Sequence, residues 1–361
     1  MEERIIRVAI LGQGRSGRDI HAKYLMKATN KYKIIAVSDT LPERRKRAEE
    51  ELGCQAYSDY REIFKRDDID LFINALPSHL HVPVTKEILN AGFHVLCDKP
   101  LARKVKEVDM LIKAAEKSGK ILAVFQQSRY SPAFQQIKKI INSGVLGRIV
   151  QISIAYNGFS RRWDWQTLQE FYGGSLLNTG PHPLDQIIDL LNSEKIPEVF
   201  CIMDRVNTYG DAEDYVKLIL RLPEKPVVDL EISCCDAYPT FTYHIQAKNG
   251  GLKGDLKRLE WKYYKPEEAP ERKLQTTPIE NPDGTPAYCG EKLKFYEEHW
   301  ELSEEQKDML MYMVGCFYNM LYDTLVYGKP LEITLQQVRQ QIAVIEKCQK
   351  QNPQIYGKPK K

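Results

Sequence analysis

The stretch Ile5–Gly17, which reads Ile-Ile-Arg-Val-Ala-Ile-Leu-Gly-Gln-Gly-Arg-Ser-Gly, decides the fold class. Its first seven residues are mostly apolar and β-branched, which predicts a short strand buried on both faces. Glycines follow in a G-x-G-x-x-G pattern, just before a helix predicted near 18–27. In that setting they permit a tight turn and a close approach of pyrophosphate to the helix N-terminus. The predicted cofactor loop comprises Gly12, Gln13, Gly14, Arg15, Ser16 and Gly17.

Asp39 ends the second predicted strand, residues 33–38, and lies 22 residues beyond Gly17. An acidic residue at about 20 residues' distance holds the ribose hydroxyls of a dinucleotide and disfavours a 2′-phosphate. NAD is therefore expected in preference to NADP. Two alternatives remain open: Asp39 also suits a cap for the helix predicted at 43–52, and Arg44 lies close enough to bind a 2′-phosphate, so NADP stays a candidate.

Strand and helix patterns alternate as far as Phe125, which predicts a parallel sheet with right-handed crossovers. The strands are expected at 70–76, 93–97 and 121–125, and the helices at 59–65, 81–91 and 105–117. Ligands of such sheets bind beyond the carboxyl ends of the strands. Leu76-Pro77-Ser78 and Asp98-Lys99-Pro100 both follow strands, so they should lie beside the glycine loop.

Lys99 is the charged residue of interest at this edge. It ends an apolar strand, and Pro100 restricts it to an extended conformation. A strand-end lysine is by default an ordinary solvated side chain. Its predicted place on the cofactor side of the sheet favours a lysine that faces the ligand.

The pattern changes after Gln126. A helix at 131–142 precedes strands of period two at 148–156, 197–205, 214–222, 226–234, 240–247 and 256–264, with turns at 223–226 and 249–251. Helices follow at 304–326 and 335–349. We predict an α/β protein with a Rossmann domain at 1–125 and an α+β domain at 126–361 that has an open, mostly antiparallel sheet. The proline-rich stretch 264–300 is either an irregular loop or a contact to a partner subunit.

Composition excludes several classes of function. The 361 residues are 43% apolar and 28% charged, with a net charge of +3, which argues against a dedicated nucleic-acid binder. Eight cysteines include no C-x-x-C pair, so neither a metal site nor a redox pair is predicted. No signal peptide or membrane-spanning run is apparent in the sequence, and we expect a cytoplasmic protein.

A second unusual stretch is Phe171–Gln186, Phe-Tyr-Gly-Gly-Ser-Leu-Leu-Asn-Thr-Gly-Pro-His-Pro-Leu-Asp-Gln. Its prolines predict a helix that begins near 179–181. His182 then lies at a helix N-terminus, where the dipole disfavours the imidazolium. A neutral histidine beside Asp185 suits proton transfer from an alcohol, although His182 packed against Asp185 is the structural alternative.

These motifs combined resemble the Gfo/Idh/MocA oxidoreductases. Four segments match family motifs: the glycine loop, Pro77-Ser-His-Leu-His81, Asp98-Lys99-Pro100 and Asn178-Thr-Gly-Pro-His182-Pro-Leu-Asp185. Asp98 stands where the family usually has Glu, and Asn178 stands where it usually has the first Asp of the motif. The resemblance covers 7 to about 349. It implies NAD(P)-dependent hydride transfer at a carbinol carbon of a sugar or polyol, and a homodimer or homotetramer through the C-terminal sheet. An NAD-dependent glycosidase that retains its cofactor and a non-catalytic NAD-sensing regulator are the alternatives.

The resemblance also implies site residues. Lys99 and His182 would be the catalytic pair. Further cofactor contacts would come from Leu76, Pro77, His81, Asp98 and Lys99. The substrate would meet Lys99, Arg129, Tyr130, Trp163, Trp165, Asn178, His182 and Asp185.

Ordinary pKa values rank the roles of the pair. A lysine of pKa ~10.4 must drop by about 3.4 units to act as a base at neutral pH, which costs roughly 4.6 kcal/mol, whereas histidine at ~6.5 needs no shift. We therefore expect His182 to be the base and Lys99 the cation that stabilises a developing alkoxide. Desolvation, or the positive nicotinamide, would exchange the roles of Lys99 and His182.

Overall fold

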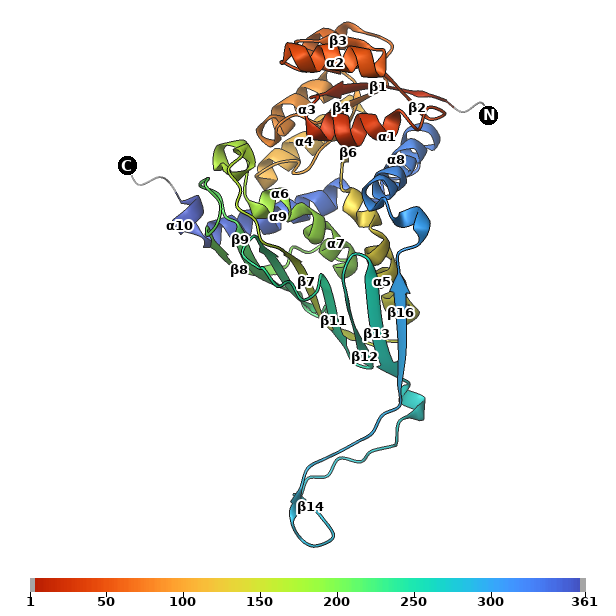
Figure 1. Ribbon diagram of the computed structural model, residues 1–361, viewed down its shortest axis with the longest axis vertical. Coiled ribbons are helices and arrows are strands. Elements are labelled where there is room, and N and C mark those ends of the chain that lie inside the picture. Colours follow the sequence, from red (N-terminus) through yellow and green to blue (C-terminus); the bar gives the residue numbers. More distant parts are fainter. Residues whose placement is uncertain (1–3, 358–361) are drawn as a thin grey trace.

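A computed structural model describes residues 4–357, which form two layered parts and a projecting arm (Figure 1). The first part is built on a parallel six-stranded sheet of order β3-β2-β1-β4-β5-β6. Its strands are β1 (Ile6–Leu11), β2 (Tyr32–Ser38), β3 (Gln55–Tyr57), β4 (Leu71–Asn74), β5 (His94–Cys97) and β6 (Leu122–Val124). The predicted Rossmann architecture is confirmed, and β1 lies at the centre because its apolar residues are buried on both faces.

Helices connect these strands. They are η1 (Arg15–Ala22), α1 (Lys23–Leu25), α2 (Pro42–Leu52), η2 (Tyr60–Lys65), η3 (Ser78–Leu80), α3 (His81–Asn90) and α4 (Val105–Ser118). The helix expected near 18–27 begins three residues earlier, at Arg15, and its first eight residues are wound as a π-helix. The start of this helix therefore lies directly on the glycine loop.

The second part contains an eight-stranded sheet of order β16-β13-β12-β11-β7-β10-β9-β8, in which only the β7–β10 pair is parallel. The strands are β7 (Ile149–Asn157), β8 (Glu198–Asp204), β9 (Tyr215–Arg221), β10 (Val227–Ser233), β11 (Tyr243–Ala247), β12 (Gly250–Gly254), β13 (Arg258–Tyr264) and β16 (Phe295–Glu301). The open, mostly antiparallel sheet expected from the period-two pattern is confirmed.

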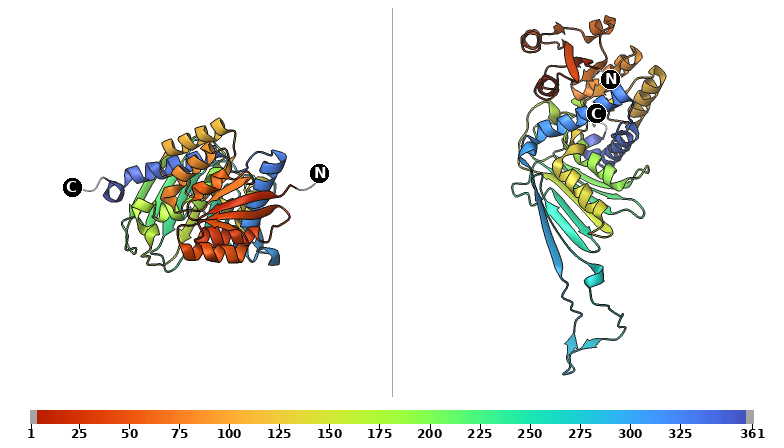
Figure 2. Two further views of the ribbon diagram at one scale, coloured as in Figure 1. Left: turned by 90° about the horizontal axis from the view of Figure 1, so that it is seen from above. Right: turned by 90° about the vertical axis from the view of Figure 1, so that its right-hand side faces the viewer.

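Helices of the second part lie over one face of this sheet or, as for α8, beside the first part (Figures 1 and 2). They are η4 (Gln127–Tyr130), α5 (Pro132–Ser143), η5 (Trp165–Thr167), η6 (Gln169–Phe171), α6 (Ser175–Asn178), α7 (Pro181–Leu191), η8 (Glu304–Gln306), α8 (Met309–Tyr327), α9 (Leu335–Gln351) and α10 (Pro353–Tyr356). Both α8 and α9 also touch the first part, through η1 and α4. Within residues 4–357, no helix has the length and apolar character needed to cross a membrane.

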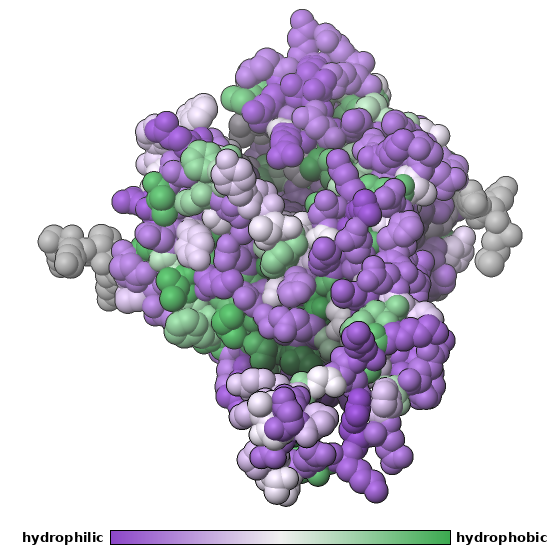
Figure 3. Space-filling model, turned by 60° about the horizontal axis from the view of Figure 1, so that its bottom comes forward, coloured by the Kyte–Doolittle hydropathy of each residue, from purple (hydrophilic) through white to green (hydrophobic). Residues whose placement is uncertain are grey.

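The other face of the sheet carries exposed apolar side chains, including Phe200 (61% exposed) and Ile202 (51%). In Figure 3 the surface seen from below is largely polar, with apolar side chains gathered near its middle. The homodimer or homotetramer expected through this sheet stays a prediction.

The prediction of a turn at 249–251 is wrong in part. Gly250 and Gly251 belong to β12, a strand that the sequence pattern did not predict. A Cβ on Gly250 would lie 2.0 Å from the carbonyl oxygen of Lys262, so glycine is needed where two strands approach closely. Glycine therefore marks strand contact here, not a reversal of the chain.

The excursion expected at 264–300 is shorter than predicted, because its last residues form β16 and pair with β13. Residues 265–294 make an arm that projects well clear of the two sheets (Figures 1 and 2). The short η7 (Pro266–Glu268) lies at its base, and β14 (Ile279–Glu280) pairs with β15 (Pro286–Ala287) near its tip. Leu274 and Tyr288 are 91% and 98% exposed on it. Contact of the arm with a partner subunit stays a prediction.

Candidate active site

The glycine loop is shaped by close backbone contacts. Gly12 has φ +91°, and a Cβ there would lie 2.7 Å from the carbonyl oxygen of Ala75. A Cβ on Gly17 would lie 1.8 Å from the carbonyl oxygen of Gly12. The loop thus runs flat against the start of η1, where the first N–H groups of a helix have no partner within the helix. This cradle fits the pyrophosphate of a dinucleotide.

Asp39 joins the end of β2 to the glycine loop. Its side chain is 6% exposed, and its Oδ2 accepts a hydrogen bond from the backbone N–H of Gln13 at 2.8 Å. Its Oδ1 accepts from the N–H of Leu41 at 3.0 Å, but Leu41 is the N-cap residue of α2, so Asp39 fixes the turn before the helix and does not cap the helix itself. Arg44 approaches Oδ2 at 3.5 Å. The carboxylate and Arg44 therefore occupy the place where the adenosine ribose of a dinucleotide is expected.

His81 ties together two of the predicted cofactor loops. Its Nδ1 lies 2.8 Å from the carbonyl oxygen of Pro100, and its Nε2 lies 2.8 Å from that of Leu76. Burial lowers the pKa of His81, so the neutral ring donates to one of these oxygens at a time. Pro77 follows Leu76 and leads into η3. The ring thus fixes the loop after β4 relative to the loop after β5.

Asp98 is the centre of a buried polar network that sequence reasoning missed. Its Oδ2 accepts a hydrogen bond from Ser16 Oγ at 2.5 Å, and its Oδ1 lies 3.1 Å from His21 Nε2. The other ring nitrogen of His21 lies 2.7 Å from the hydroxyl of Tyr318. Although burial opposes ionisation, the interaction with His21 holds the pKa of Asp98 below its usual value. Tyr318 lies in α8, and no local pattern could have paired it with the first domain.

Lys99 lies between the two parts of the chain. Its Nζ donates a hydrogen bond to the backbone carbonyl of Asn178 at 2.6 Å. Burial lowers the pKa of Lys99 to about 8; the negative charge of Asp98 opposes the shift, and the positive charges of Arg15 and Arg162 add to it. A lysine with this pKa is partly neutral near physiological pH and can accept a proton.

His182 is the second residue of α7, which begins at Pro181 as predicted. Its Nδ1 lies 3.1 Å from Ser128 Oγ, a contact that the sequence did not suggest. Burial, and then the charge of Lys99, lower the pKa of His182 to about 3. These pKa values exchange the roles expected from ordinary pKa values: His182 resists protonation at neutral pH, whereas the pKa of Lys99 is lowered far enough for it to act as the base, because burial makes both side chains resist a positive charge.

Arg129 and Asp185 do not fit the expectation that they contact the substrate. They are 3% and 2% exposed and pair with each other through two hydrogen bonds of 2.7 and 2.6 Å. Arg129 also donates to Asp189 at 2.8 Å. Asp185 is thus occupied by Arg129 and not by His182. The structure gives this pair a role in holding α7, and Tyr130 likewise turns its hydroxyl toward Glu332 at 2.9 Å.

The two tryptophans differ in environment. Trp163 is 80% exposed. Trp165 is 41% exposed and meets Phe171 edge-on, with 6.3 Å between ring centroids. Phe171 in turn lies 5.1 Å from the ring of His79, in the loop after β4. Aromatic side chains of the second domain therefore meet the first domain near the predicted cofactor loops, a contact that the sequence did not predict.

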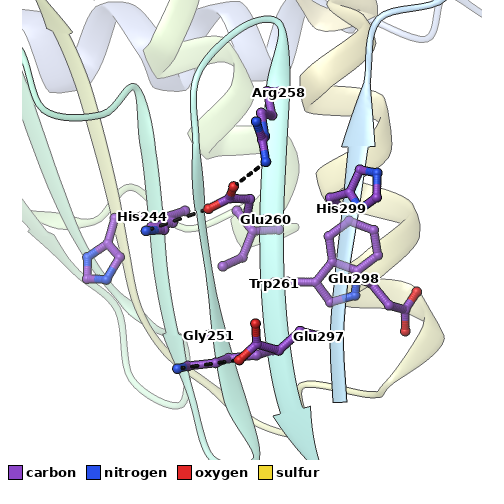
Figure 4. Close-up of a pocket in the computed structure, with 11 residues that line it drawn as sticks. His244, Gly251, Arg258, Glu260, Trp261, Glu297, Glu298 and His299 are labelled. Carbon is purple, nitrogen blue, oxygen red and sulfur yellow. Dashed lines mark ion pairs between the residues drawn. The ribbon is translucent and has the colours of Figure 1, made fainter. Parts of the chain in front are cut away.

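A groove of about 530 Å³ lies elsewhere, on the open face of the second sheet (Figure 4). Its charged side chains pair with one another: Arg258 with Glu260 at 2.7 Å, and Lys262 with Glu297 at 4.0 Å. It contains none of the residues expected for catalysis. We therefore place the candidate active site at Lys99 and His182.

Comparison with curated proteins finds relatives of moderate identity. The scyllo-inositol 2-dehydrogenase (NADP(+)) IolW of Bacillus subtilis is 30% identical over 217 residues, which cover 60% of this chain and 59% of that protein. The 2,7-anhydro-N-acetylneuraminate hydratase of Mediterraneibacter gnavus is 26% identical over 256 residues, 69% of this chain and 67% of that protein. These alignments leave about a third of the Mediterraneibacter gnavus protein and more than a third of the Bacillus subtilis protein unmatched.

Among solved structures, the WlbA dehydrogenase of Bordetella pertussis in complex with NADH and UDP-GlcNAcA has a TM-score of 0.75 at 20% identity. It covers 98% of this chain and 97% of that one, and at this identity it supports the fold alone. A family model described as an oxidoreductase family with an NAD-binding Rossmann fold matches residues 6–126, and one for the GFO/IDH/MocA C-terminal domain matches residues 134–253. Because both domain models of one family match in succession, over the two parts of the chain that the bond from Lys99 to Asn178 joins, the chain belongs to the Gfo/Idh/MocA oxidoreductase family.

Proposed function

We propose that the protein is an NAD(P)-dependent dehydrogenase that oxidises a carbinol carbon of a sugar, a polyol or a related compound. The observation that carries the proposal is Lys99, a buried lysine with a pKa of about 8 that lies between the cofactor loops and the segment of Asn178 and His182. Such a group is suited to proton transfer at neutral pH.

Each residue has a distinct role in the proposed reaction. A bound NAD or NADP, held by the glycine loop and Asp39, would supply the acceptor for the hydride of the carbinol carbon. Neutral Lys99 accepts the proton of the substrate hydroxyl on Nζ, so the hydroxyl loses its proton as the carbon loses its hydride, and a carbonyl results. His182 stays neutral, and because Nδ1 faces Ser128 we assign its Nε2 to a hydrogen bond with the substrate. The carbonyl oxygen of Asn178 orients the lysine.

Aromatic side chains near the site support a sugar-like substrate. Trp165 and Phe171 offer ring faces of the kind that pack on the C–H faces of sugars. The curated relative from Bacillus subtilis bears the name of an inositol dehydrogenase.

A screen of cofactor reduction tests the function. We expect the purified protein to reduce NAD or NADP, monitored at 340 nm, with at least one member of a panel of inositols, sugars and sugar acids. Failure with every member, in a protein shown to bind cofactor, would contradict the dehydrogenase. Turnover of a glycoside or anhydro-sugar without net reduced cofactor would favour the second candidate, an enzyme that oxidises transiently and retains NAD. The hydratase name of one relative supports including that assay.

Asp39 gives a prediction about the choice of cofactor. In Asp39→Ser we expect the Kd of NAD to rise by at least about tenfold, because a hydrogen bond to a charged acceptor contributes about 1.5–3 kcal/mol. The Kd of NADP should fall, because Arg44 loses its carboxylate neighbour and can meet a 2′-phosphate. Calorimetric titration with both cofactors measures the ratio.

The matched control is Asp59→Ser. Like Asp39, Asp59 accepts a hydrogen bond from the backbone N–H two residues further on, at 3.0 Å, but it lies at a loop that holds none of the predicted cofactor contacts. It should leave both Kd values unchanged. An unaltered NAD to NADP ratio in Asp39→Ser would refute the role of Asp39 in cofactor choice.

A further inference from the structure

We infer that Glu213 and Tyr356 form a positioning pair that holds the segment of Asn178 and His182 against Lys99. Neither residue belongs to a motif identified in the sequence, and neither touches the reacting atoms in the proposed chemistry. The inference rests on the proposed function for its catalytic meaning, but its contacts stand independently of any substrate.

Glu213 lies under the start of α6. It is 1% exposed, and its Oε1 accepts a hydrogen bond from the backbone N–H of Leu176 at 2.8 Å. Its own backbone carbonyl accepts from the N–H of Ser175 at 2.9 Å. A Cβ on Gly174, which has φ +105°, would lie 2.4 Å from Glu213 Oε2. The glycine therefore makes room for this carboxyl, whose pKa burial raises to about 7.

Tyr356 holds the other oxygen of Glu213. Its hydroxyl donates a hydrogen bond to Oε2 from α10, which lies beside β8 and β9 in Figure 1. The neighbouring backbone is fixed as well, because Gln169 Nε2 donates to the carbonyl of Ile355 at 3.0 Å. The guanidinium of Arg103 lies 5.7 Å from the ring centroid of Tyr356. Because Arg103 follows Lys99 by four residues, α10 contacts the segment after Lys99 as well as Glu213.

The single helical turn of α6 connects Glu213 with the catalytic lysine, Lys99. The helix α6 has four residues, too few to be stable by itself, so its place depends on what holds its ends. Glu213 holds the N–H at its start, and its last residue, Asn178, presents the carbonyl that accepts from Lys99 Nζ. His182 follows four residues later in α7. A displacement of α6 therefore moves both the lysine's acceptor and the histidine.

The test measures the pKa of Lys99 without any substrate. The full-length protein is labelled with an amine-directed reagent across a pH series, and the labelling of Lys99 is quantified by mass spectrometry. In Glu213→Ala we expect the midpoint to fall by at least about 0.5 pH unit, because loss of the Asn178 acceptor disfavours the ammonium. Glu213→Gln should stay within about 0.2 unit of the wild type, since its amide can still accept from Leu176 and meet Tyr356.

Two further variants complete the design. Tyr356→Phe removes only the hydroxyl and should shift the midpoint in the same direction by a smaller amount. Glu198→Ala removes an exposed carboxylate from β8 and should cause no shift. An unmoved midpoint in folded Glu213→Ala would overturn the inference. If that variant fails to fold, an unmoved midpoint in Tyr356→Phe overturns it.

Kinetics separate the inference from the proposed function. With an active substrate, Glu213→Ala should lower kcat by at least about tenfold while KM and the Kd of NAD stay within about twofold, and Glu213→Gln should restore kcat. A wild type that labels normally but oxidises nothing would defeat the proposed function and leave the positioning result intact. A Glu213→Ala enzyme with unchanged kcat would overturn the positioning role alone.

Discussion

Replacing Lys99 with methionine is expected to lower kcat by about 10²–10⁴-fold, the range for loss of a positioned acid–base group. Methionine keeps the unbranched apolar stem but has no group that can accept the substrate proton. Calorimetric titration should show the Kd of NAD within about threefold of the wild type, since the glycine loop and Asp39 are untouched. Reduction of cofactor at saturating substrate measures the loss. Turnover within tenfold of the wild type, at several pH values, would remove Lys99 from catalysis.

The pH profile distinguishes the two members of the pair. Because burial lowers the pKa of Lys99 to about 8, the neutral base is scarce below this pH, and kcat/KM for oxidation should rise as pH passes through about 8. His182→Asn should reduce kcat yet keep this limb, because the pKa of His182 is near 3 and the ring is already neutral. Lys99→Met should lose the limb. A limb near pH 8 that disappears in His182→Asn and persists in Lys99→Met would assign the base to His182.

Much of the fold follows from local sequence rules. The glycine motif after an apolar strand predicts the parallel sheet, and the period-two strands predict the open sheet. Both patterns can be recognised locally because they depend on burial of neighbouring residues. The strand β12 was missed since glycine is read as a turn residue, and only the approach of Lys262 across the sheet explains Gly250. The sequence pattern also failed to predict β16, and so placed the end of the arm too late. This strand is largely polar, and its strand conformation depends on its pairing with β13.

The sequence predicts candidate residues for the site but does not predict their electrostatics. Lys99 and His182 lie in motifs that sequence alone identifies, and the structure places both beside the junction of the domains. Their pKa values depend on burial and, for Lys99, on the charges of Arg15 and Arg162, which come from distant parts of the chain. Long-range partners such as Tyr318 for His21 leave no local signal. Geometry in three dimensions therefore determines which residue of the pair takes the proton.

Arg129→Ala is expected to destabilise the protein by about 3–5 kcal/mol, because it leaves a buried carboxylate without its partner. Asp185 is 2% exposed and receives two hydrogen bonds from Arg129, which also binds Asp189. Urea unfolding at pH 8 measures the loss. The matched control is Arg339→Ala, whose pair with Asp109 joins two helices at the surface and should contribute less than about 1 kcal/mol.

The pH dependence of this loss gives a second, independent check on the Arg129 prediction. Burial raises the pKa of Asp185, and Arg129 opposes that shift, so removing Arg129 raises the pKa further. The penalty from the unpaired charge is present above the folded-state pKa and disappears as pH falls and the carboxyl binds a proton. The stability difference between Arg129→Ala and the wild type should therefore be larger at pH 8 than at pH 5. An equal difference at both values would mean that lost packing, and not the stranded charge of Asp185, accounts for the effect.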